Sequence, residues 1–232
     1  MQQEQIIGGR RCFLYGDEEA DIFLIQAAGD HEWNALVREA EYIKELACGT
    51  PFALAAFLIE DWNNQLSPWE APAVFGEDGF GAGAVETLNY VTGILFPTLA
   101  QTYGQEHSMD FCLGGYSLSG LFALWASYQT DALSGVAAVS PSVWFPGWDT
   151  YMMSHSPWAQ KIYLSMGEKE EKTKNKSMSI VGDRIRKQYE LLCKDDHVQA
   201  CLLEWNPGNH FTDPEIRMAK GFAWLLNSRQ NT

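Results

Sequence analysis

Ser117 lies where one apolar segment turns sharply into another. Residues 110–114 are typical of a short strand and residues 118–128 of a helix, with Gly115 two residues before the serine and Ser119 two after. Small residues at both positions let strand and helix approach without a clash. The turn lifts the hydroxyl above the sheet, beside the free N–H groups that begin the helix. The pattern predicts a nucleophilic serine, although Ser119 replaces the usual glycine; the alternative is a plain helix N-cap.

A serine hydroxyl needs a base within hydrogen-bond reach. The chain offers five histidines: His31, His107, His155, His197 and His210. His210 is favoured, because it follows the last expected strand (198–205) in a loop that returns over the nucleophile in a sheet of this kind. His31 follows an earlier strand and is a candidate to line the site, but it precedes the serine. His197 lies in a charged turn and is expected to face solvent.

The third group must orient the imidazole and stabilise its cation. The expected strand 161–165 is followed by three carboxylates, Glu168, Glu170 and Glu171. We favour Glu170, which stands three residues after Gly167 at the strand end, with Glu168 second and Glu171 third. Two of the three must be ordinary solvated glutamates. The order along the chain is then serine, acid, histidine.

Backbone N–H groups must also hold the oxyanion that forms on the substrate. One donor is expected from Leu118, the residue after the nucleophile. The other is expected from Asp30, in the turn that follows the apolar strand 21–27, with Gly29 close behind.

Two loops rich in aromatic residues, 60–83 and 144–158, are candidates to shape a substrate pocket. Their tryptophans are Trp62, Trp69, Trp144 and Trp148, of which we select Trp62 and Trp144 as pocket residues. The alternative, that such side chains cover the core, is the more frequent case. A capping or solvated role is favoured for Glu60 and Asp61.

These residues need a scaffold that brings distant loops together. Short apolar runs alternate with longer amphipathic ones, which predicts a mainly parallel sheet with helices on both faces. The expected strands are 11–15, 21–27, 52–59, 110–114, 135–139, 161–165 and 198–205. The expected helices are 34–47, 85–103, 118–128, 178–194 and 214–226, the second bent near Gly93 or Pro97. Ligands in such sheets bind at the carboxyl ends of the strands, where every candidate residue stands.

The composition narrows the possible partners. The chain has 232 residues, 46% of them hydrophobic, and a net charge of −14, so we expect one domain over residues 1–232. The acidic balance argues against nucleic acid and anionic membranes as partners. Cys12, Cys112 and Cys201 lie in apolar runs and are expected as buried, reduced thiols, without a metal site or cofactor. The polar N-terminus does not resemble a signal peptide, and we expect a cytoplasmic protein.

Four stretches of the chain resemble an esterase family of α/β-hydrolases that includes esterase D-like enzymes and enterochelin (ferric siderophore) esterases. These are residues 115–124, 140–144, 163–170 and 207–211. The resemblance implies an α/β-hydrolase fold and a Ser-acid-His ester hydrolase without a cofactor. Substrates in the family vary, from S-formylglutathione to siderophore lactones and acylated sugars.

The leading hypothesis is therefore hydrolysis of a small-molecule carboxylic ester, such as a siderophore or a small acyl ester, through an acyl-enzyme. Acyl transfer to an alcohol and a non-catalytic binding protein with the same fold are the alternatives. A homo-oligomer is left open.

Overall fold

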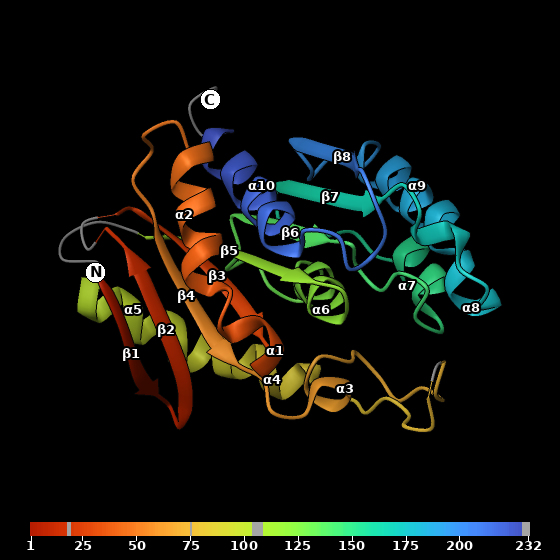
Figure 1. Ribbon diagram of the computed structural model, residues 1–232, viewed down its shortest axis with the longest axis horizontal. Helices are drawn as coiled ribbons and strands as arrows, with labels where there is room; N and C mark the ends of the chain where they lie inside the picture. The colour runs from red at the N-terminus through yellow and green to blue at the C-terminus, as the bar shows by residue number, and fades with distance from the viewer. Residues whose placement is uncertain (18–19, 75, 104–108, 229–232) are drawn as a thin grey trace.

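The computed structural model describes residues 1–17, 20–74, 76–103 and 109–228. Within them one eight-stranded sheet runs in the order β1-β2-β4-β3-β5-β6-β7-β8 (Figure 1). The strands are β1 (Gln2–Ile7), β2 (Arg10–Gly16), β3 (Ile22–Ala28), β4 (Ala53–Leu58), β5 (Asp110–Tyr116), β6 (Gly135–Val139), β7 (Lys161–Gly167) and β8 (Ala200–Asn206). From β4 through β8 the neighbours pair in parallel, whereas β2 is antiparallel to both β1 and β4. The mainly parallel α/β sheet expected from the sequence is confirmed.

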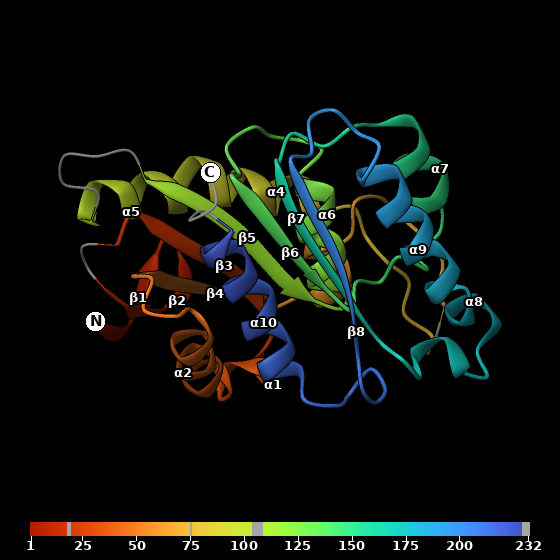
Figure 2. The ribbon, with the colours of Figure 1, turned by 90° about the horizontal axis from the view of Figure 1, so that it is seen from above.

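Helices cover both faces of this sheet. They are α1 (Asp30–Trp33), α2 (Leu36–Leu46), α3 (Trp62–Gln65), α4 (Ala84–Tyr90), α5 (Phe96–Tyr103), α6 (Leu118–Ala126), α7 (Trp148–Ser154), α8 (Lys176–Ser179), α9 (Val181–Leu192) and α10 (Pro214–Asn227). A π-helical turn η1 (Val91–Leu95) joins α4 to α5, and a 3-10 turn η2 (Glu170–Lys172) follows β7. The apolar sides of α2 and α10 pack together on one face, and those of α4, α5, α6 and α9 on the other (Figure 2).

Burial on two faces explains why the central strands are apolar throughout. All residues of β3 and β6 are buried, as parallel strands between two helical layers require. The strands β3, β5, β6, β7 and β8 end at the same edge. This edge carries the turns that hold the candidate residues.

The N-terminal segment differs from expectation, because β1 precedes segment 11–15, which the sequence predicts as the first strand. It pairs with β2 across Gly8 and Gly9, which have φ values of 55° and 85°. Such φ values suit the tight turn of a hairpin. Most residues of β1 are exposed, so this edge strand lacks the apolar signal of the others.

Two helices were also assigned inaccurately. In the expected helix 34–47, the apolar residues Val37 and Leu46 are exposed, whereas Glu39 is buried. The aromatic segment 144–158 is not all loop, since α7 forms within it and buries Trp148 completely. Segment 85–103 is divided by the π-helical turn η1, which contains Gly93, one of the two positions where a bend is expected.

The cysteines are free thiols: Cys12 and Cys112 are buried, Cys201 is only half-buried, and Cys48 and Cys193 are exposed. None of the helices in the described ranges is long and apolar enough to cross a membrane.

Candidate active site

Ser117 occupies the strained turn that the sequence predicts. It joins β5 to α6 with φ 60° and ψ −120°, a conformation that costs free energy for any residue with a side chain. Three backbone hydrogen bonds of 3.0 Å hold it: its N–H donates to the Val139 carbonyl, and its own carbonyl accepts from the N–H groups of Leu121 and Ser142. The rigid turn presents the hydroxyl at the carboxyl edge of the sheet.

The residues flanking Ser117 leave no room for larger side chains. A Cβ added at Gly115 would lie 2.3 Å from the Ser119 hydroxyl and 2.4 Å from its backbone. The Ser119 hydroxyl donates to the Ala27 carbonyl at 2.7 Å, within the core. The serine that replaces the usual glycine therefore ties the start of α6 to the end of β3, a contact that sequence reasoning missed.

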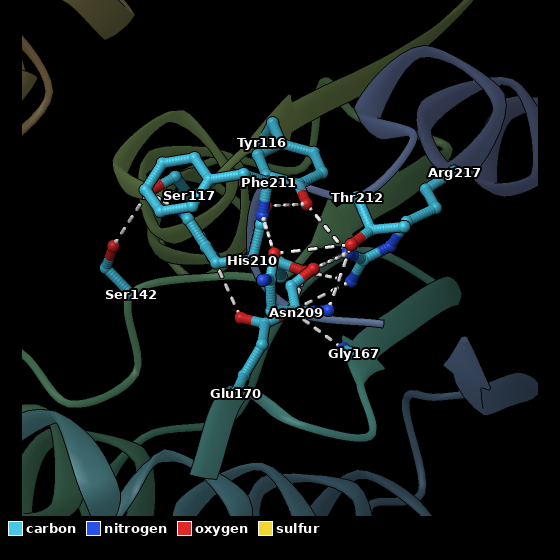
Figure 3. A network of polar contacts seen from close by, with 11 residues as sticks. Tyr116, Ser117, Ser142, Gly167, Glu170, Asn209, His210, Phe211, Thr212 and Arg217 are labelled. Atoms are coloured by element: carbon cyan, nitrogen blue, oxygen red, sulfur yellow. Dashed lines mark hydrogen bonds and ion pairs between the residues drawn. The ribbon is translucent and has the colours of Figure 1, made fainter. Parts of the chain in front are cut away.

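His210 and Glu170 complete a hydrogen-bonded chain with Ser117 (Figure 3). The imidazole Nε2 of His210 lies 3.0 Å from Ser117 Oγ, and its Nδ1 lies 2.8 Å from Glu170 Oε2. Because an ionised carboxylate only accepts, Nδ1–H donates to Glu170 and Nε2 is left to accept the serine proton. The structure thus brings together the three side chains that the sequence analysis selected.

Glu170 is distinguished from its neighbours by what surrounds it. Its side chain is 5% exposed, and its Oε1 accepts from the Gly167 N–H and the Ser140 hydroxyl, both at 2.7 Å. By contrast, the Glu171 carboxylate pairs with Arg186 at the surface, and Glu168 lies in the exposed turn after β7.

Burial by itself raises the pKa of Glu170, but the hydrogen bond and charge of His210, with the bonds from Ser140 and Arg217, outweigh it and hold the pKa at about 2. Glu170 is therefore a carboxylate at neutral pH. In that state it can orient the imidazole and stabilise its cation.

Arg217 anchors this network from α10 and was not foreseen. The guanidinium is 2% exposed; it donates to Glu170 Oε1 at 3.0 Å, to the Tyr116 hydroxyl at 2.8 Å and to the Ser140 hydroxyl. The Tyr116 hydroxyl in turn donates to the His210 carbonyl at 2.6 Å, and burial raises its pKa to about 12. Only the position of Arg217 among apolar helix residues hinted at burial.

The other described histidines stand apart from this chain of hydrogen bonds. His197 is exposed and pairs with Asp195, as expected, and His155 stacks on Tyr151. His31 lines a pocket beside Ser117, with its ring edge-to-face with Trp62. His107 lies outside the described residues.

The candidate oxyanion donors begin two helices. Leu118 is the first residue of α6 and Asp30 the first of α1, so neither N–H has a partner within its helix. The N–H of Gly29, the second choice on that loop, donates to Glu32 Oε2 at 2.9 Å. Asp30 thus stays the better candidate of the two.

Two cavities flank His210. One, of about 250 Å³, is lined by Ser117, His31 and Trp62; the other, of about 270 Å³, by Trp144, Lys169 and Lys172. The two selected tryptophans therefore each line a cavity. The other two loop tryptophans, Trp69 and Trp148, instead stack on each other at 6.4 Å, which favours a packing role.

In loop 60–83, Asp61 caps α3 by accepting from the Asn64 N–H, in agreement with the capping role favoured for it. The described residues contain no group of three or more His, Cys, Asp or Glu placed to hold a metal ion.

No family model matches the chain, and neither does any curated protein. Solved structures do match over nearly the whole chain. Siderophore hydrolase EstA from Aspergillus nidulans is 16% identical with a TM-score of 0.72, covering 98% of this chain and 93% of that one. An IroE-like serine hydrolase from Shewanella oneidensis is 14% identical with a TM-score of 0.78, covering 98% and 80%. The enterobactin and salmochelin hydrolase IroE is 15% identical with a TM-score of 0.66, covering 97% and 94%. These likenesses confirm the α/β-hydrolase fold expected for the chain.

Proposed function

We propose that this protein is a serine hydrolase that cleaves a carboxylic ester through an acyl-enzyme. The observation that carries the proposal is the continuous hydrogen-bonded chain from Ser117 through His210 to Glu170. The strained turn at Ser117 and the hydrolase fold support it.

In the first half-reaction, Ser117 Oγ attacks the ester carbonyl carbon while its proton passes to His210 Nε2. The carbonyl π electrons move to the oxygen, and the N–H groups of Leu118 and Asp30 are the proposed donors to this oxyanion. Glu170 stabilises the imidazolium through Nδ1–H. When the oxyanion collapses, the bond to the alcohol oxygen breaks, and the alcohol leaves with the proton from Nε2.

In the second half-reaction, water attacks the acyl-enzyme and gives its proton to His210 Nε2. Collapse of the second tetrahedral intermediate breaks the bond to Ser117 Oγ, which takes the proton back as the acid departs. Acyl transfer differs only in that an acceptor alcohol replaces the water.

The substrate is proposed as a siderophore or another small acyl ester. The names of the structural neighbours, siderophore hydrolase and enterobactin and salmochelin hydrolase, support the first choice. A panel from short acetyl esters to siderophores and acyl sugars would rank these substrates.

Labelling with a fluorophosphonate probe tests the nucleophile. We expect labelling of the native protein and of Ser142→Ala, whose hydroxyl lies 3.5 Å from Ser117 Oγ, but none of Ser117→Ala. Equal labelling of Ser117→Ala would contradict the assignment. Absence of both labelling and ester turnover in the native protein would favour the non-catalytic alternative. Product analysis with added alcohols separates hydrolysis from transfer.

A further inference from the structure

The cavity that holds Ser117 has an acidic wall. We call it the carboxylate pocket and define it by Ser117, Trp62, Glu32, Glu39 and Glu215. The three carboxyl groups come from α1, α2 and α10, and α2 and α10 lie side by side (Figure 1). Among the described residues that line this pocket there is no lysine or arginine, whereas the second cavity, which His210 also lines, has two lysines.

Glu39 is the least satisfied of these groups. It is 4% exposed, and its Oε2 accepts one long hydrogen bond of 3.4 Å from Gln26 Nε2. Its Oε1 has no hydrogen-bond partner in the described part of the chain, and the same holds for Gln26 Oε1. Buried acceptors without a partner are rare in folded proteins, so this one calls for an explanation.

Among the described residues, the groups that line the pocket supply no counter-charge to Glu39. Glu32 accepts a hydrogen bond from the Gly29 N–H, and Glu215 pairs with Arg38, whose side chain is 60% exposed. Burial, together with the charge of Glu32, raises the pKa of Glu39, and burial raises that of Glu32 to about 7. The remaining titratable lining groups are His31, Tyr116 and His210.

We infer that the carboxylate pocket receives a protonated amine carried by the ester substrate, next to the scissile carbonyl. An ammonium group provides the N–H donors that Glu39 Oε1 lacks, and it provides the missing positive charge. The Trp62 ring adds a π face that attracts cations. The inference rests on the proposed function for the position of the carbonyl, but the pocket itself does not depend on catalysis.

Amine binding is coupled to protonation of the carboxyl groups. A bound cation favours the ionised form, so any proton held by Glu39 or Glu32 leaves to solvent as the ammonium enters. The ester and the amine are not altered in this step.

Binding to the Ser117→Ala protein tests the inference without turnover. Calorimetry would compare methyl 6-aminohexanoate, methyl hexanoate and monomethyl adipate, which place a cation, a methyl group or an anion at similar distances from the ester. We expect the amine to bind at least tenfold more tightly than the other two. Equal or weaker binding of the amine would overturn the inference.

Two further variants in the Ser117→Ala background locate the effect. Glu39→Gln keeps the shape of the side chain and is expected to remove most of the tenfold preference. Glu41→Gln, an exposed neighbour on the same helix, is expected to keep it. An unchanged preference for the amine in Glu39→Gln would overturn the assignment of the site.

Methyl 6-(trimethylammonio)hexanoate has the charge but no N–H donor, and it should bind more weakly than the amine. Equal binding of the two would overturn the role of donor hydrogen bonds.

Turnover of p-nitrophenyl hexanoate by the native protein measures the proposed function separately. Hydrolysis of this ester without a preference for the amine would refute this inference and would still support the proposed esterase activity. Preferential binding of the amine without hydrolysis would support the amine site and would refute the proposed esterase activity.

Discussion

Replacing Arg217 by methionine removes the buried cation that holds Glu170 in place. The two side chains are 2% and 5% exposed and lie 3.0 Å apart, so solvent cannot replace the lost partner. Methionine fills most of the volume but leaves Glu170 Oε1 with only the Ser140 hydroxyl and the Gly167 N–H as donors. The carboxylate remains buried with less positive charge beside it.

The expected loss of stability is large for one substitution. Breaking a buried ion pair from one side costs about 3–5 kcal/mol. His210 contributes most to the low pKa of Glu170, followed by Ser140 and Arg217, so the loss of Arg217 should raise that pKa only in part. For a chain of this size the melting temperature should fall by roughly 6–20 °C.

The free energy of unfolding should also depend on pH differently in Arg217→Met than in the native protein. In the native protein, ionised Glu170 contributes stability that is present above its ordinary pKa of 4.5 and is lost as the pH falls towards about 2. Without Arg217 the folded-state pKa rises, so the difference from the unfolded chain shrinks. The acid side of the stability curve should then become flatter between pH 2 and 4.5.

Urea unfolding at a series of pH values, with ester turnover at each, measures both effects. The matched control is Arg11→Met, which breaks an exposed pair with Glu4 and should cost under about 1 kcal/mol. We expect kcat to fall in Arg217→Met, with Arg217→Lys intermediate. The role given to Arg217 would be refuted if Arg217→Met lost no more stability than Arg11→Met and if its stability between pH 2 and 4.5 changed with pH as in the native protein.

Three further changes test the site. Glu170→Gln should lower kcat by roughly 10³–10⁴-fold, because the imidazolium loses its carboxylate partner. Glu171→Gln should leave kcat unchanged, and similar kcat values for the two variants would contradict the choice of Glu170 as the acid. Gly115→Ala should abolish turnover and lower the melting temperature, since its Cβ has no space beside Ser119. Ser119→Ala should lower the free energy of unfolding by about 1–3 kcal/mol in urea, because the buried Ala27 carbonyl loses its donor; no change would show that the tie to β3 is dispensable.

Local patterns determined much of this protein. The turn at Ser117 depends on residues close in the chain, and the histidine follows a strand that is recognisable from its own apolar run. Strand and helix alternation then implies that both lie at one edge of a parallel sheet. The sequence therefore predicts the fold class and the nucleophile and base candidates without any knowledge of contacts. The sequence does not predict β1, because most residues of this edge strand are exposed and show no alternation of apolar and polar residues.

Tertiary packing decided the rest. The spacing from Gly167 favours Glu170 over Glu168 and Glu171 but leaves all three possible. Only the approach of β6, α10 and the His210 loop surrounds one of them with donors. Glu39 looks like an ordinary surface charge on an amphipathic helix, and the apolar neighbours of Arg217 only hint at its burial, yet α2 and α10 bury both side chains. Whether a charged side chain meets water or a partner depends on elements far away in the chain. No local pattern records that environment, which is why the sequence shows the serine but not the network behind it.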